Sequence, residues 1–199
     1  NRFLLKVLGL SGLLLGGCAT VVDAQAPAVP EYVIRPALQP SHRADLMYQV
    51  LLAELAGKRD HLDVALTNYR QAATASNDPR IAERAAMLAL IMKDNATALD
   101  LARRWQALDP GSEQAQQALA LALLRNGRED EAMASLDAVR GAARAKDKQQ
   151  GFATVASLLS QMDDKQAALR VMRRLRDRYP REAYAQYYYA MLAAAADER

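Results

Sequence analysis

The sequence predicts an all-α protein built as a solenoid of helix–turn–helix repeats, and three observations support this fold class. Alanine contributes 41 of the 199 residues, while the β-branched residues that favour strands are sparse from Leu46 onward. Alanines recur with a period near 34, because Ala65, Ala98, Ala132 and Ala168 are 33, 34 and 36 residues apart. Beyond residue 40, proline occurs only at positions 79, 110 and 180, as expected of a residue that cannot continue a helix.

The chain opens with a segment typical of a secretory signal peptide. Arg2 and Lys6 give it a basic start, and a leucine-rich run of 15 residues extends from Phe3 to Gly17. Because a helix needs roughly 18 to 20 apolar residues to span a bilayer, a permanent transmembrane helix is disfavoured. An ordinary signal peptide followed by a buried cysteine is one interpretation of this opening.

The other interpretation rests on the sequence Leu15-Gly16-Gly17-Cys18, which resembles the lipobox of bacterial lipoproteins. The resemblance implies a signal peptide over residues 1–17 and a covalent N-acyl diglyceride on Cys18, carrying palmitate-type chains. Three acyl chains, at ~0.8 kcal/mol per buried methylene, would anchor the protein permanently. An aspartate after the cysteine retains such lipoproteins at the inner membrane, and Ala19 stands there instead. The resemblance therefore implies lipid anchoring in the outer membrane, facing the periplasm.

Residues 18–44 are expected to form a Pro- and Ala-rich spacer after the lipidated cysteine. It holds four of the seven prolines, and their close spacing is incompatible with an α-helix. The stretch from Tyr32 to Leu38 is more apolar than a tether needs, so packing on a neighbour or binding a partner is the alternative.

Residues 45–199 carry a repeated pattern of small and large residues at helical spacing. The first helix of each repeat shows a pair ending in alanine: Leu52-Ala53, Ala85-Ala86, Leu119-Ala120, Val155-Ala156 and Tyr189-Ala190. The second helix shows three positions on one face: Ala65, Tyr69, Ala72; Ala98, Ala102, Trp105; Ala132, Leu136, Val139; Ala168, Met172, Leu175. This pattern resembles the tetratricopeptide repeat (TPR), which implies a right-handed superhelix of about four and a half repeats.

Turns inside the repeats are expected at residues 58–61, 94–95, 126–128 and 162–164. The third repeat lacks its terminal proline, so a loose loop over Ala142–Gln150 is expected there. The fifth unit has one predicted helix, Ala183–Ala196. Since a solenoid normally ends on a polar capping helix, we expect the chain to be the N-terminal part of a longer protein.

In TPR proteins, fixed positions of the first helices line a concave groove that binds peptides or protein surfaces. Transferring this register gives the partner-binding candidates Glu54, Arg80, Glu83, Arg84, Met87, Gln114, Gln117, Leu121, Arg125, Gln150, Ser157, Tyr184, Tyr187 and Tyr188. Tyrosine and arginine are frequent interface anchors. For Tyr187 and Tyr188, packing against a following helix is an equally good interpretation.

A second candidate surface is the arginine-rich helix with Arg170, Arg173, Arg174, Arg176, Arg178 and Arg181. A solvated face is the simpler interpretation. The alternative is a docking surface for an acidic partner, because few acids lie nearby in the sequence.

The sequence contains no convincing nucleophile–base set, no paired carboxylates in an apolar setting and no Gly-rich phosphate loop. His42 and His61 have no ligand partners at suitable spacing. The formal charge of +3 falls to +1 once Arg2 and Lys6 are removed with the signal peptide, which gives no sign of nucleic-acid binding. The sequence therefore predicts a protein that is not an enzyme, with no metal and no cofactor beyond the lipid.

Lipobox, spacer and repeats together resemble the outer-membrane lipoprotein scaffolds of Gram-negative bacteria. Over the whole chain, and most specifically in the opening as far as Pro27, the sequence further resembles the LbcA-type adaptors of a periplasmic carboxyl-terminal processing protease. This resemblance implies a scaffold that binds and activates a CtpA-type serine protease and brings cell-wall hydrolases to it as substrates. Lipoproteins of outer-membrane-protein assembly and type IV pilotins share the anchor and the fold, and remain an alternative. An enzyme with its active site in a missing C-terminal region is the alternative from another class.

Overall fold

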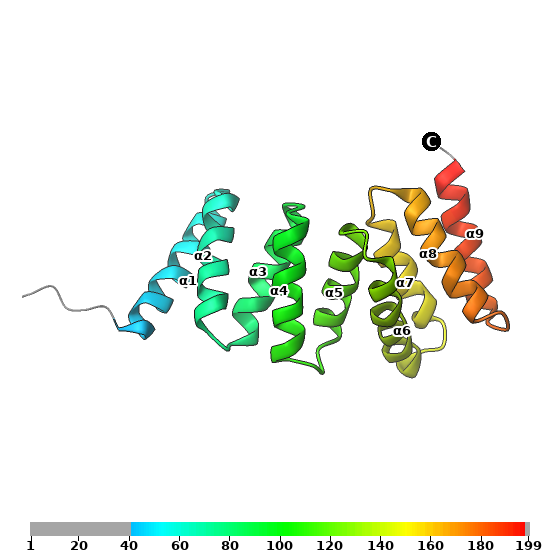
Figure 1. The fold of residues 1–199 in the computed structure, drawn as a ribbon, viewed down its shortest axis with the longest axis horizontal. Coiled ribbons are helices and arrows are strands. Elements are labelled where there is room, and N and C mark those ends of the chain that lie inside the picture. The colour runs from blue at the N-terminus through cyan, green and yellow to red at the C-terminus, as the bar shows by residue number, and fades with distance from the viewer. Residues whose placement is uncertain (1–40, 198–199) are drawn as a thin grey trace, which may run out of the picture. The chain divides into compact units, whose positions relative to one another are not determined.

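The computed structural model describes residues 41–197, which form nine α-helices and no strand (Figure 1). The helices are α1 (His42–Lys58), α2 (Leu62–Ala75), α3 (Pro79–Ile91), α4 (Asn95–Leu108), α5 (Glu113–Arg125), α6 (Glu129–Lys146), α7 (Gln150–Ser160), α8 (Lys165–Arg178) and α9 (Ala183–Asp197). The predicted signal peptide, Cys18 and the spacer up to residue 40 lie outside the described residues. No helix among residues 41–197 is long and apolar enough to cross a membrane.

The helices pair in chain order, α1 with α2, α3 with α4, α5 with α6 and α7 with α8, and α9 packs on both α7 and α8. The first helices also contact one another from repeat to repeat, since α3 touches α5, α5 touches α7 and α7 touches α9. The second helices α6 and α8 make the equivalent contact. Figure 1 shows these helices following one another in stacked pairs from α1 to α9. The predicted all-α helix–turn–helix solenoid is therefore confirmed.

The repeated small residues are buried in this stack. All twelve second-helix positions in the sequence pattern are buried, and their leading alanines Ala65, Ala98, Ala132 and Ala168 are at most 1% exposed. Because an alanine side chain ends at Cβ, the backbones of neighbouring helices can approach here without leaving a void. The last first-helix pair differs, since Ala190 is exposed and Tyr189 only half-buried.

Three of the turns inside the repeats reverse the chain in the same way. Asp60, Lys93 and Gly127 adopt left-handed backbone conformations, with φ of 62°, 58° and 70°. The residue after each one donates its N–H to a carbonyl in the last turn of the helix that precedes it, at 2.9 to 3.0 Å. These turns lie where the sequence predicts them.

The region around the third repeat differs from the expected loose loop. Helix α6 continues through Ala142 to Lys146, and only residues 147–149 separate it from α7. The alanine and basic residues that follow Gly141 are good helix formers, and they continue the helix despite the glycine. Gly151 then lets α7 approach α6, since a Cβ on Gly151 would lie 3.0 Å from the Arg144 Cβ.

Helix α1 begins at His42, three residues before the expected start of the solenoid. Ser41 caps this helix, because its hydroxyl oxygen accepts a hydrogen bond from the Ala44 N–H at 3.2 Å.

Candidate protein-binding groove

Three neighbouring hollows follow the first helices of the repeats. The first hollow, of about 360 Å³, lies between α1, α2 and α3. The central hollow, of about 210 Å³, is lined by α3, α4, α5 and α7. The third hollow, of about 470 Å³, lies between α5 and α7. Met87 lines both the first and the central hollow, and Gln117 lines both the central and the third. We call this continuous surface from Glu54 to Ser157 the groove.

The groove contains nine of the fourteen residues that the TPR register selects. They are Glu54, Glu83, Arg84, Met87, Gln114, Gln117, Leu121, Gln150 and Ser157. These side chains come from four helices that are separated by up to 103 residues in the sequence, and the solenoid brings them to one face. These nine register positions therefore share one face of the solenoid.

An ion pair occupies the α1 end of the groove. The Arg84 guanidinium pairs with the Glu54 carboxylate and donates to the Tyr69 hydroxyl at 3.5 Å. Burial raises the pKa of Tyr69, and the neighbouring Glu54 carboxylate raises it further, so the hydroxyl stays protonated at neutral pH. Since Arg84 remains 58% exposed, a partner can still reach it.

Two predicted arginines have their guanidinium groups engaged elsewhere. Arg80 is exposed and pairs with Asp78 at 2.7 Å, at the start of its own helix and outside the three hollows. Arg125 donates to the main-chain carbonyl of Leu90 at 2.8 Å and to that of Gln161 at 3.3 Å. Arg125 therefore links the ends of α3, α5 and α7 and acts as a contact between repeats.

The three predicted tyrosines lie on α9, beyond the three hollows. Tyr184 and Tyr188 are half-buried against the core, whereas Tyr187 is 58% exposed. The Tyr187 and Tyr188 rings meet edge to face with centroids 5.0 Å apart. Of the three, Tyr187 offers the largest free aromatic surface to a partner.

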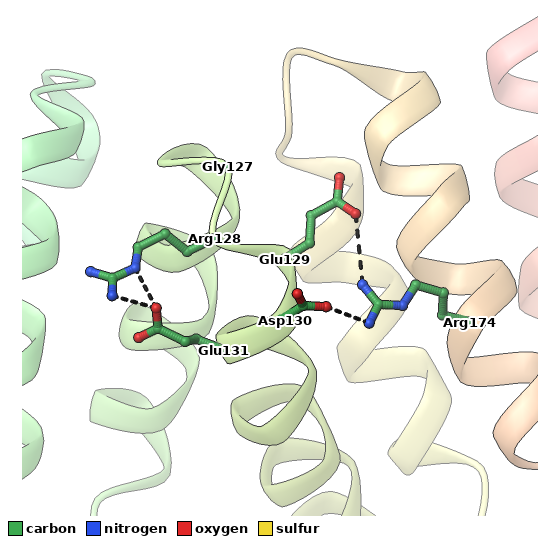
Figure 2. Close-up of a pocket in the computed structure, with 6 residues that line it drawn as sticks. All are labelled: Gly127, Arg128, Glu129, Asp130, Glu131 and Arg174. Atoms are coloured by element: carbon green, nitrogen blue, oxygen red, sulfur yellow. Dashed lines mark hydrogen bonds and ion pairs between the residues drawn. The ribbon is translucent and has the colours of Figure 1, made fainter.

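The arginine-rich helix α8 has more acidic neighbours than the sequence order suggests. Figure 2 shows Arg174 of α8 between Glu129 and Asp130 of α6, with nitrogen to oxygen distances of 3.8 Å and 2.6 Å. Arg170 reaches Glu129 at 3.3 Å, and Arg178 pairs with Asp137. The expectation of few nearby acids is therefore wrong. These arginines largely neutralise acids on α6, which weakens the case for an acidic partner at this helix.

The residues that line the hollows but are not among the fourteen candidates include Trp105, Leu158 and Gln161. Trp105 forms the floor of the central hollow from the second helix α4 and is 3% exposed, and Leu158 and Gln161 close the side next to α7. Trp105 was recognised as a core residue, but the register of first-helix positions does not include second helices. Gln161 lies at the groove position that Arg125 occupies one repeat earlier, so a complete transfer of the register would have found it.

Among residues 41–197, no group of three or more histidine, cysteine, aspartate or glutamate side chains could hold a metal ion.

Comparison with known proteins supports the fold. No family model matches the chain. The TPR repeat-containing protein PA4667 of Pseudomonas aeruginosa is 35% identical over 134 residues, which are 64% of this chain. The match covers 23% of that relative, so the chain spans less than a quarter of its length.

Two solved structures share the arrangement of helices. A tetratricopeptide repeat protein from Parabacteroides merdae has a TM-score of 0.51 at 17% identity, covering 77% of this chain and 60% of its own. MamA from Desulfovibrio magneticus RS-1, from its residue 41 onward, has a TM-score of 0.50 at 18% identity, covering 77% and 86%. The chain therefore has the TPR fold.

Proposed function

We propose that this protein is a non-catalytic scaffold that binds a protein partner along the groove. The observation that supports this most strongly is the continuity of the groove from α1 to α7, with nine register-selected residues on one face. A solenoid of packed helices presents such a surface without having to order it at binding, which lowers the entropic cost of association.

The partner we propose is a periplasmic carboxyl-terminal processing protease, with cell-wall hydrolases as the substrates that the scaffold presents to it. The resemblance of the chain opening to LbcA-type adaptors supports this choice, and so does the similarity to a TPR repeat-containing protein of a Gram-negative bacterium. Holding protease and substrate on one scaffold makes their encounter intramolecular, at effective concentrations up to the millimolar range. Activation additionally requires that the scaffold bind one protease conformation better than another.

The experiment that tests this function is capture of the purified protease by the chain and by single-residue variants. We expect Arg84→Ala and Met87→Ala each to weaken capture several-fold, because they remove an exposed guanidinium and an exposed apolar side chain from the groove. Arg80→Ala is the matched control, since Arg80 is exposed on the same helix but outside the hollows.

Thermal melts of the same variants separate a loss of binding from a loss of folding. If Arg84→Ala and Met87→Ala melt like the parent protein and capture the protease with unchanged affinity, the partner does not use the groove.

We also propose that the protein is held in the outer membrane by lipid on Cys18, on the strength of the lipobox resemblance. Cys18→Ser should leave the repeats folded, abolish labelling with palmitate and release the protein from the membrane fraction. An unlabelled mutant that stays in the outer-membrane fraction would contradict the lipid anchor.

A further inference from the structure

The central hollow of the groove has an apolar floor. Trp105, Leu90, Leu121 and Leu158 line it, and each is less than 9% exposed. Its volume of about 210 Å³ exceeds the ~150 Å³ of an apolar cavity that accommodates benzene. The hollow is therefore large enough for one aromatic or branched aliphatic side chain.

Side-chain amides surround this floor. Gln114, Gln117 and Gln161 line the hollow, and Glu83 is the one charged side chain among its lining residues. A glutamine amide offers both a carbonyl acceptor and N–H donors, so it can pair with the N–H and C=O groups of an extended peptide backbone. A charged partner residue would lose water here without finding an opposite charge, apart from a cation beside Glu83.

The neighbouring third hollow continues this uncharged character. Its lining residues from α5 and α7 include Gln117, Gln150, Thr154 and Ser157, and none of them is charged. At the other side, the charges of Arg84 and Glu54 already neutralise each other. Lys58 is the remaining charged residue of the first hollow, whereas a partner segment lying across the central and third hollows meets Glu83 as the one charged side chain, although a quarter of the whole chain is charged.

We propose that the central hollow is a socket for one aromatic or branched aliphatic side chain of an extended, locally uncharged partner segment. Gln114, Gln117 and Gln161 bond the backbone of that segment on either side of the anchor. This inference rests on the proposed function, because it takes the groove as the binding surface. It excludes an acidic side chain or a terminal carboxylate as the anchor, since the hollow offers no cation to either.

Binding in the socket can be followed through the spectroscopic signals of Trp105. Trp105 is the single tryptophan of the sequence and lies at the floor of the hollow. The probe is the capped tripeptide acetyl-Gln-Phe-Gln-amide, titrated into the millimolar range, and acetyl-Gln-Asp-Gln-amide is the matched control peptide. We expect a saturable change in Trp105 fluorescence and in its indole N–H resonance with the phenylalanine peptide, and at least tenfold weaker binding of the aspartate peptide.

Variants of Gln117 and Gln114, which line the hollow, test whether the Trp105 signal comes from binding in the hollow. Gln117→Phe should cover the hollow and weaken binding of the phenylalanine peptide at least tenfold. Gln166→Phe, on the exposed face of α8, should leave it unchanged. If Gln117→Phe lowers the melting temperature, Gln114→Phe at an exposed side chain provides the same test.

The socket is overturned if the titration gives no saturable signal, if both peptides bind equally, or if the folded Gln117 and Gln114 variants bind like the parent protein. Protease capture by the same protein separates this failure from a failure of the proposed function. Capture that depends on Arg84 in the absence of peptide binding overturns the socket alone. Peptide binding in the absence of any capture supports the socket and overturns the proposed partner.

Discussion

At the scale of single residues, two arginines tie each repeat to its neighbours through main-chain carbonyls. Arg104 of α4 donates to the carbonyl oxygens of Ala73 and Ser76 at the end of α2, the second of these bonds being 2.7 Å long. Arg125 makes the corresponding contacts to Leu90 and Gln161. The last carbonyls of a helix have no partner within it, so an arginine from the next repeat can satisfy them.

Arg104→Ala should therefore lower the free energy of unfolding by about 2 kcal/mol, because it leaves partly buried carbonyls without a charged donor. Arg103→Ala is the control, since the neighbouring Arg103 makes an exposed pair with Glu131 at 3.0 Å and should change stability by less than about 0.5 kcal/mol. Urea denaturation of both variants measures the difference. Equal losses would show that the bonds of Arg104 to α2 contribute nothing of their own.

The cap of α3 should make stability depend on pH. Asp78 accepts the Arg80 N–H at 2.9 Å, and the hydrogen bonds from the Arg80 side chain and backbone hold the pKa of Asp78 below its ordinary value of 3.8. Because the folded pKa is the lower one, this contribution is complete above pH ~4 and is lost as the pH falls through the folded value.

Asp78→Ala should thus cost about 1 kcal/mol of folding stability at pH 7. The gap between the parent protein and the variant should narrow below pH ~4, as measured by urea denaturation at several pH values. A gap that stays constant down to pH 2 would contradict the assigned role of the carboxylate.

At the scale of the structural element, three of the turns inside the repeats share a left-handed residue, but only one of them has a glycine there. Only Gly127 has the residue type that this conformation favours, whereas Asp60 and Lys93 carry side chains there. The Asn126-Gly127 pair made the third turn the clearest one in the sequence. The other turns were predictable from their place in the repeat but not from their residue types.

Gly127→Ala should lower stability by about 1 kcal/mol, because alanine is strained at a φ of 70°. Gly141→Ala is the opposite case, since Gly141 lies within α6 and no atom approaches its added Cβ within 4 Å. It should raise stability by about 0.5 to 1 kcal/mol. Thermal melts of the two variants should shift in opposite directions, and a shift in the same direction would contradict the turn geometry.

At the scale of the whole molecule, the repeat period determined the fold and most of the groove. Ala65, Ala98, Ala132 and Ala168 set the register, and that register brought nine candidates onto one face. The contacts between repeats could not be predicted from the sequence in the same way. The carbonyls that Arg125 bonds are main-chain groups with no sequence signature, and the acids of α6 that pair with α8 lie 41 to 45 residues earlier. Their proximity follows only from the way in which α6 stacks on α8.

The central claim is that the face formed by the first helices binds the partner. Photo-crosslinking from a benzoylphenylalanine placed at Gln117 or at Gln166 tests it most directly, because Gln117 lines two hollows of the groove and Gln166 is exposed on α8. With the protease present, we predict an adduct from position 117 and none from position 166. An adduct from position 166 alone would contradict the claim and move the binding surface to the second helices.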